Sequence, residues 1–261
     1  MNATTLTAPV PADITGISTR PGLGRLVAVE LRKVFNTRAG FWMQAATAAL
    51  TVLVVVLSSI VGEPADHTFA AILDVGSKPA AVLLPITGIL LVTTEWSQRT
   101  GMITFTLVPI RSRILGAKLI ASLVLTVGTL LLAVGVVAAG VLVASPRIDG
   151  TWTDVTPLIG QTAIYLAVGT LTGVAFGMLF LGPTPATIAL FAFPIAFTGL
   201  ATLAFLADAA PWLDTRLALG VMPREVMSGT EWARAGTASA IWMLLPLLIG
   251  LWRITRQEVS V

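Results

Sequence analysis

The sequence contains no cysteine among its 261 residues and only one histidine, His67. The absence of cysteine excludes disulfide bonds, thiolate metal sites and a cysteine nucleophile. A metal site would need several ligands around His67, and only Asp66 lies beside it in the sequence. Charged residues are also scarce, at 11% of the chain, whereas hydrophobic residues make up 56%. With a mean hydropathy of +0.90, this composition is typical of polytopic membrane proteins and not of soluble domains.

A nucleotide-binding motif is missing as well. The glycine-rich stretch Gly22-Leu23-Gly24-Arg25 has neither the spacing nor the lysine of a phosphate-binding loop. The chain is therefore not expected to hydrolyse ATP, and no cofactor is expected in it.

Six apolar segments are each long enough to cross a hydrocarbon core of ~30 Å as a helix. They lie at about residues 41–61, 75–94, 114–144, 158–181, 184–207 and 236–254. The fourth and fifth are separated only by Gly182-Pro183, which leaves room for no more than a tight turn. The sequence thus predicts an all-α fold in which residues 41–261 form a six-span transmembrane domain.

Two segments precede the predicted spans. Residues 1–21 are polar and show no periodic pattern, so we expect a disordered cytoplasmic tail. Residues 22–40 place apolar side chains broadly on one side of a helix and basic side chains on much of the rest. This pattern predicts an amphipathic helix in the headgroup region of the membrane.

The distribution of basic residues predicts the orientation of the chain. With the N-terminus inside, 11 of the 16 lysines and arginines lie in cytoplasmic segments and five in outer ones. Nine of the 13 acids lie outside. This asymmetry satisfies the positive-inside rule and predicts that both termini are cytoplasmic. Because topology accounts for the basic excess, no nucleic-acid partner is expected.

The segment between the second and third spans is the longest charged interruption in the apolar sequence. It runs from Glu95 to Lys118 and carries three arginines besides Lys118. Apolar residues between Met102 and Ile110 give it an apolar surface, and Pro109 ends any helix there. The pattern predicts a cytoplasmic helix that lies on the membrane surface or docks on a soluble partner.

This stretch resembles the permeases of type-2 ABC exporters. An acid ends the second span, a glycine step and a short apolar helix follow, and Pro-x-Arg and a lysine precede the third span. The usual Gly-Thr order is reversed here, as Thr100-Gly101. In that family the stretch is the coupling helix, which sits in a groove of the ATPase subunit. The resemblance assigns ATPase coupling to Glu95, Arg99, Gly101, Phe105, Pro109, Arg111 and Arg113. The alternative is an ordinary cytoplasmic loop of a polytopic protein.

The resemblance also implies partners and a location. The chain would be a permease subunit of a bacterial cytoplasmic membrane, paired with a second permease that is identical or related. Two copies of a separate ATPase would bind ATP and Mg. Residues 22–40 would form the helix that leads into the first span, and short re-entrant helices within 208–235 would cap the substrate path.

The interiors of the six predicted spans contain no ionisable residue. Ion-driven transporters and intramembrane enzymes usually need such a group at depth, so both are disfavoured. An uncharged path suits an apolar or amphipathic substrate such as a drug, a lipid or a hydrophobic peptide. A membrane sensor or assembly protein without transport activity remains an alternative, and an intramembrane enzyme is a weaker one.

Small and polar residues within the spans suggest two further roles. Gly169, Gly173 and Gly177 recur every four residues and predict close helix packing, and Gly128 and Gly135 have a related spacing. In the resembling family the first and fifth spans line the dimer interface and the path. The candidate path residues are Gln44, Thr47, Thr51, Phe197, Thr198 and Thr202. Ordinary packing, with threonines bonded to their own helices, is the alternative.

Overall fold

The computed structural model describes residues 22–61, 67–97, 111–144, 151–201 and 208–256. Every regular element within these ranges is helical, which confirms the all-α prediction. The long helices are α1 (Leu23–Asn36), α2 (Arg38–Ile60), α3 (Phe69–Ser97), α5 (Arg111–Ala144), α6 (Val155–Phe180) and α7 (Pro183–Leu200). The C-terminal elements are α8 (Ala210–Leu213), α9 (Thr215–Leu219), α10 (Gly229–Ser239), the π-helical turn η3 (Ala240–Leu244) and α11 (Leu245–Arg256).

Six helical stretches are long and apolar enough to cross a membrane, as predicted. They are Arg38–Ile60, Phe69–Thr94, Arg113–Ala144, Val155–Phe180, Pro183–Leu200 and Gly229–Ile254. The second and sixth begin earlier than predicted. The sixth begins at Gly229 because Ser228 and Glu231 form a reciprocal capping box at that point. The predicted end of the fifth span, 202–207, lies outside the described residues.

Ionisable groups lie toward the ends of three of these stretches, and Lys78 and Lys118 already fell within the predicted bounds. Asp74 and Lys78 lie inside the second candidate span, Lys118 inside the third, and Glu231 and Arg234 inside the sixth.

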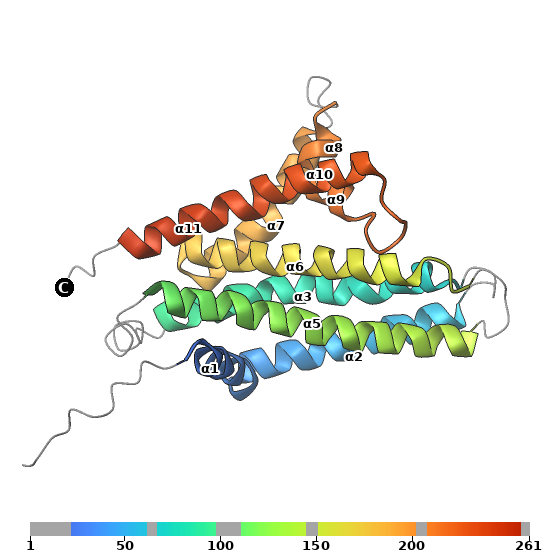
Figure 1. Ribbon diagram of the computed structural model, residues 1–261, viewed down its shortest axis with the longest axis horizontal. Helices are drawn as coiled ribbons and strands as arrows, with labels where there is room; N and C mark the ends of the chain where they lie inside the picture. Colours follow the sequence, from blue (N-terminus) through green and yellow to red (C-terminus); the bar gives the residue numbers. More distant parts are fainter. Residues whose placement is uncertain (1–21, 62–66, 98–110, 145–150, 202–207, 257–261) are drawn as a thin grey trace, which may run out of the picture.

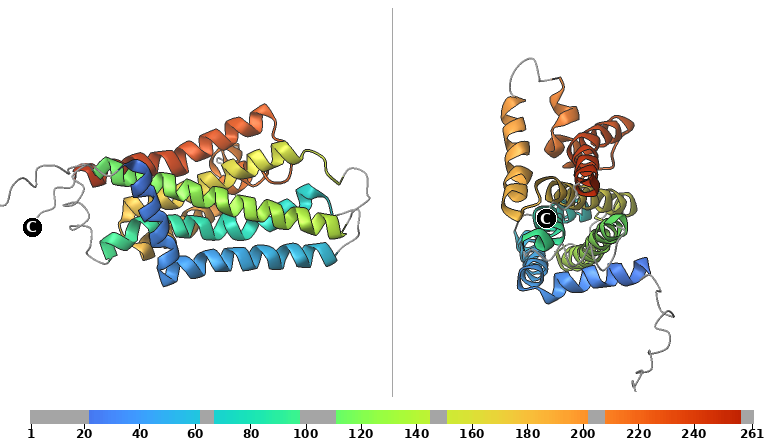
Figure 2. Two further views of the ribbon diagram at one scale, coloured as in Figure 1. Left: turned by 60° about the horizontal axis from the view of Figure 1, so that its bottom comes forward. Right: turned by 90° about the vertical axis from the view of Figure 1, so that its left-hand side faces the viewer.

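Four helices, α2, α3, α5 and α6, run side by side along the long axis of the molecule (Figure 1). The central helix is α3, which packs against α2, α5, α6 and α7. Helix α1 lies across one end of this bundle, over α5 and α2 (Figure 2). Thr37 separates α1 from α2, because its side chain accepts a hydrogen bond from the Gly40 N–H and begins a new helix. We refer to this end of the bundle as the α1 end.

Buried apolar clusters join the helices near both ends of the bundle. One brings together Val55, Phe69, Ile72, Leu73, Val137, Val141 and Leu158 from α2, α3, α5 and α6. Another joins Val92, Leu115, Val174, Met178 and Ile254 from α3, α5, α6 and α11. Large apolar side chains also point outward from α2, α5 and α7, as with Leu53, Leu131 and Ile195. Outward apolar surface on long helices is expected where lipid is the solvent.

The sixth span is continuous through α10, η3 and α11. The π-helical turn has a local cause, because Pro246 has no N–H to donate to the carbonyl four residues earlier. The N–H of Leu245 instead bonds to the carbonyl of Ala240, five residues back. Helices α8 and α9 lie beside the bundle and stop short of the end where α2 and α5 finish (Figure 1).

Candidate functional site

The stretch predicted to couple to an ATPase lies at the α1 end. Helix α3 ends at Ser97 and α5 begins at Arg111, so the two helices that flank the stretch both meet this end (Figure 1). Glu95 is in the last turn of α3, and Arg113, in the first turn of α5, is half-buried. Arg99, Gly101, Phe105 and Pro109 lie outside the described residues.

A buried ion pair lies directly beside these helix ends. The Lys118 ammonium on α5 lies 2.9 Å from a Glu30 carboxylate oxygen on α1. The two side chains are only 3% and 6% exposed. Lys118 also donates a 2.8 Å hydrogen bond to the carbonyl of Leu91 on α3. One ammonium group therefore links α1 to both helices that flank residues 98–110.

Glu30 uses its second carboxylate oxygen as well. That oxygen accepts a 2.8 Å hydrogen bond from Lys33, which is one turn further along α1. Apolar contacts surround the pair, since Val34 of α1 packs with Leu91, Ala121 and Leu125. A buried ion pair with further hydrogen bonds on both partners can offset the cost of desolvation. The sequence analysis did not predict this ion pair. Glu30 lies on the same helix face as Val27 and Val34, and this position could have indicated that Glu30 is buried.

The glycines predicted for helix packing face α3. A Cβ added to Gly173 would lie 2.6 Å from the carbonyl carbon of Pro85, and one added to Gly177 would lie 3.3 Å from the Cα of Ile89. At Gly169 the added atom would lie 3.6 Å from the Pro85 ring. The glycine row of α6 therefore lets the backbone of α3 approach closely at Pro85. Gly128 and Gly135 take no part in such packing within the described chain, because an added Cβ there meets nothing within 4 Å.

The polar residues of α2 point into the bundle. Gln44 donates a 3.1 Å hydrogen bond to the hydroxyl of Thr87 on α3. Thr47 and Thr51 are 2% and 0% exposed, and Thr47 bonds back to the carbonyl of Met43. These three side chains therefore take part in packing within the chain.

The path residues of α7 are tied to the C-terminal elements. The hydroxyl of Thr198 donates a 2.8 Å hydrogen bond to Asp214, a buried carboxylate that also begins α9. The ring of Phe197 lies edge-on to Trp242 of η3, with the centroids 6.0 Å apart. Thr202 lies outside the described residues. The structure thus brings Thr198 and Phe197 together with η3 and α9, but not with the polar residues of α2.

Two further polar clusters lie away from the α1 end. Asp74 of α3 is paired with Lys78 at 2.6 Å and with Arg224 at 3.0 Å. The buried Gln161 of α6 donates to the carbonyls of Met222 and Glu225 at 2.9 and 2.7 Å, and it accepts the N–H of Met227 at 2.9 Å. These bonds fix the segment between α9 and α10 onto the bundle. The sequence did not predict this role for Gln161, because a single glutamine within an apolar segment forms no recognisable pattern.

No group of three or more metal-ligating residues occurs in the part of the chain that the structure describes. His67 is buried, and its Nε2 lies 2.9 Å from the carbonyl of Val61. The ring therefore binds the backbone at the end of α2.

A scan against protein-family models and a search of curated proteins each gave no match. The class that the structure defines is a polytopic membrane protein with six candidate spanning helices. Its described ion pairs lie at the α1 end and around Asp74 of α3.

Proposed function

We propose that this chain is the permease subunit of an ATP-driven exporter of the type-2 ABC class. The observation that carries the proposal is the connection at the α1 end. Glu30, Lys118 and the carbonyl of Leu91 bind α1 to the two helices that flank residues 98–110. An amphipathic helix, a basic stretch between spans two and three, and short helices between spans five and six occur together in this chain, as they do in that family.

The buried pair gives this connection a mechanical consequence. A force on residues 98–110 acts on the ends of α3 and α5, and both ends are joined through Lys118 to α1. The cost of breaking a buried charge pair makes these three helices move together. In the proposed cycle, closure of the ATPases shifts the 98–110 segment, and the shift passes to the spans through this junction.

The partners follow from the same proposal. Two ATPase subunits would bind ATP and Mg, and a second permease, identical or related, would complete the path. The protein would lie in the cytoplasmic membrane with the α1 end and both termini in the cytoplasm. Arg25, Arg32, Arg38 and Arg253 lie at that end, in agreement with the positive-inside rule.

The substrate class follows from the outer surface of the spans. The polar side chains of α2 are used for packing, whereas Leu53, Val56 and Ile60 of α2 and Ile188 and Ile195 of α7 are exposed. A path along these faces would be apolar. We therefore propose an apolar or amphipathic substrate, such as a drug, a lipid or a hydrophobic peptide.

The experiment is purification of the tagged chain from its native membrane, followed by detection of a co-purifying ATPase by Mg-dependent ATP hydrolysis. Phe105→Ala removes the largest apolar side chain of the proposed coupling helix, and an anchor of this kind typically contributes ≳2 kcal/mol to binding. Recovery of the ATPase should therefore fall steeply. The matched control is Leu131→Ala, which truncates a side chain that is 67% exposed on α5.

Equal recovery with wild type, Phe105→Ala and Leu131→Ala would remove the coupling role. If wild-type chain at normal expression recovers no ATPase at all, the chain is better described as a membrane sensor or assembly protein without transport activity.

A further inference from the structure

Arg234 occupies an unusual position for an arginine. It lies in the sixth candidate span, and its guanidinium lies 5.9 Å from the centre of the Trp212 ring on α8. The Nε atom is buried, and no described residue accepts a hydrogen bond from it. A buried donor without an acceptor costs about 1–3 kcal/mol.

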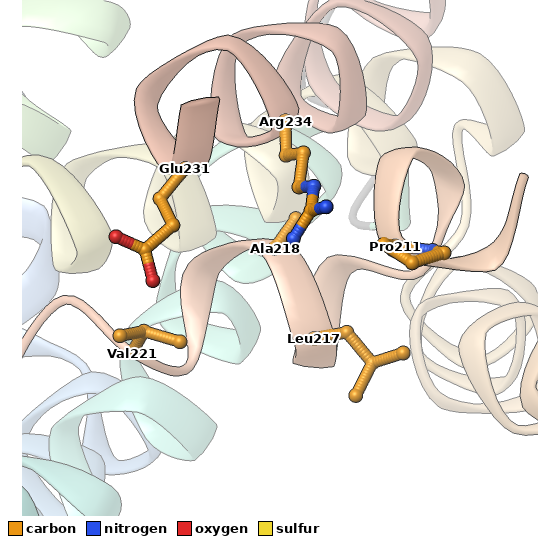
Figure 3. Close-up of a pocket in the computed structure, with 6 residues that line it drawn as sticks. All are labelled: Pro211, Leu217, Ala218, Val221, Glu231 and Arg234. Carbon is orange, nitrogen blue, oxygen red and sulfur yellow. The ribbon is translucent and has the colours of Figure 1, made fainter. Parts of the chain in front are cut away.

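The arginine borders a pocket of about 250 Å³ (Figure 3). The pocket is lined by Pro211, Leu217, Ala218, Val221, Glu231 and Arg234, which come from α8, α9, the following turn and α10. Its walls are mainly apolar. Glu231 uses one carboxylate oxygen to accept hydrogen bonds from the N–H and hydroxyl of Ser228, at 2.7 and 2.8 Å. No described ion pair joins Glu231 to Arg234, although the two opposite charges attract each other, and the buried Nε–H of Arg234 keeps its donor for another acceptor.

The short helices that form the pocket are held in place by bonds to the spans. Thr198 of α7 bonds to Asp214 at the start of α9, and the indole N–H of Trp242 donates a 2.7 Å hydrogen bond to the carbonyl of Leu213 at the end of α8. Gln161 fixes the segment that leads into α10. The pocket is therefore built on anchored elements, which favours a defined binding geometry.

We propose that this pocket binds the headgroup of a membrane phospholipid, with its phosphate on Arg234. Guanidinium groups bind phosphate oxygens through paired, charge-assisted hydrogen bonds. The volume is below the ~300 Å³ that whole drug-sized ligands need, so it fits a terminal group. Leu217, which lines the pocket, is 56% exposed and offers apolar surface for an acyl chain. Trp212 and Trp232 are residues typical of the headgroup region.

This site is independent of the proposed transport function, since binding can be measured on the purified chain alone. The probe is phosphatidylglycerol with brominated acyl chains, titrated into delipidated protein in a neutral detergent. Bromine quenches nearby tryptophan fluorescence, and the difference between wild type and Trp212→Phe isolates the signal from Trp212. Arg234→Gln should raise the half-saturating lipid concentration by about tenfold or more, because charge-assisted bonds are lost.

The matched control is Arg216→Gln, which removes an exposed arginine on the neighbouring helix α9. It should leave the titration within about twofold of wild type, because a surface charge contributes little. Equal shifts in the two variants would show a general charge effect and overturn the site. Arg234→Lys keeps the charge without the paired donors, so it should bind more weakly than wild type while melting at the same temperature.

Competition identifies the anion. Unlabelled phosphatidylglycerol should displace the brominated probe, whereas diacylglycerol, which has no phosphate, should not. Displacement by diacylglycerol at the same concentration would show that the acyl chains alone are bound and would overturn the assignment. If dodecanoate displaces the probe at a lower concentration than phosphatidylglycerol, the site prefers a carboxylate and the phospholipid proposal fails.

Discussion

Lys118 and Glu30 are 88 positions apart in the sequence, yet the ammonium of one lies 2.9 Å from the carboxylate of the other. The pair joins an amphipathic helix to a spanning helix, and almost no water reaches it, because the side chains are 3% and 6% exposed. Each partner has a second bond, to Leu91 and to Lys33 respectively. The contact therefore determines how α1 is held against the bundle, and its removal has a measurable cost.

We expect Lys118→Met to destabilise the protein strongly. The substitution keeps an apolar chain of similar length but leaves the buried Glu30 carboxylate without its partner on α5. Removing one partner of a buried pair typically costs about 3–5 kcal/mol. The measurement is thermal unfolding in detergent, followed through the tryptophans.

Lys33→Met is the matched control, because it removes the other lysine bonded to Glu30. Its side chain is 42% exposed, and such pairs contribute about 0–1 kcal/mol. The double variant Glu30→Gln with Lys118→Met should recover part of the loss, since no buried charge then remains. Equal melting temperatures for the two single lysine variants would show that the buried pair has no special role.

Gly173→Ala should destabilise the α3–α6 contact. Alanine favours a helix by up to ~1 kcal/mol over glycine, but here its Cβ would lie 2.6 Å from the carbonyl carbon of Pro85. Overpacking of this kind costs about 1–3 kcal/mol, so the net effect on unfolding is unfavourable. The control Gly128→Ala adds the same atom where nothing lies within 4 Å and should be neutral or stabilising. The same sign of change at both positions in thermal unfolding would contradict the close approach.

Gln161→Leu should loosen the segment between α9 and α10. The change leaves the carbonyls of Met222 and Glu225 and the N–H of Met227 without their partner. Buried groups left without a partner cost about 1–3 kcal/mol each. Hydrogen exchange at residues 220–227 should therefore accelerate. Gln44→Leu removes a single side-chain bond on α2 and should leave exchange in that segment unchanged. Protection equal to wild type in Gln161→Leu would show that other contacts hold the segment.

The number and approximate position of the spans could be predicted from the sequence, because an apolar run of sufficient length has few alternatives to a spanning helix. The residues at which the helices begin and end could not be predicted in this way. Asp74 and Lys78 form an ion pair one turn apart, which lets α3 begin before the apolar run. Ser228 and Glu231 cap the sixth spanning helix at Gly229, whereas the apolar residues alone predicted a start at residue 236. An ion pair between residues far apart in the sequence, such as Glu30 and Lys118, produces no local sequence pattern. The burial of Glu30 is indicated only by the apolar residues on the same face of its helix. Glycine spacing is ambiguous in the same way, since Gly173 and Gly177 of α6 meet the backbone of α3, whereas Gly128 and Gly135 of α5 meet nothing within 4 Å.

The orientation of the bundle is the last prediction. Helix α1 and the starts of α2 and α5 carry Arg25, Arg32, Lys33, Arg38 and Arg113 at the α1 end. Acids such as Asp154 lie toward the other end of the bundle. The positive-inside rule therefore predicts that the α1 end lies in the cytoplasm.

Because the chain has no cysteine, single cysteines report on each end without background. Asn36→Cys lies on the exposed surface of α1, and Thr156→Cys lies exposed in the first turn of α6, at the opposite end. An impermeant thiol reagent applied to intact cells should label Thr156→Cys and should label Asn36→Cys only after permeabilisation. The reverse pattern would place α1 outside, where no cytoplasmic ATPase could reach the 98–110 segment. It would then remove both the orientation and the proposed coupling, while the six-helix fold and the Arg234 pocket would stand.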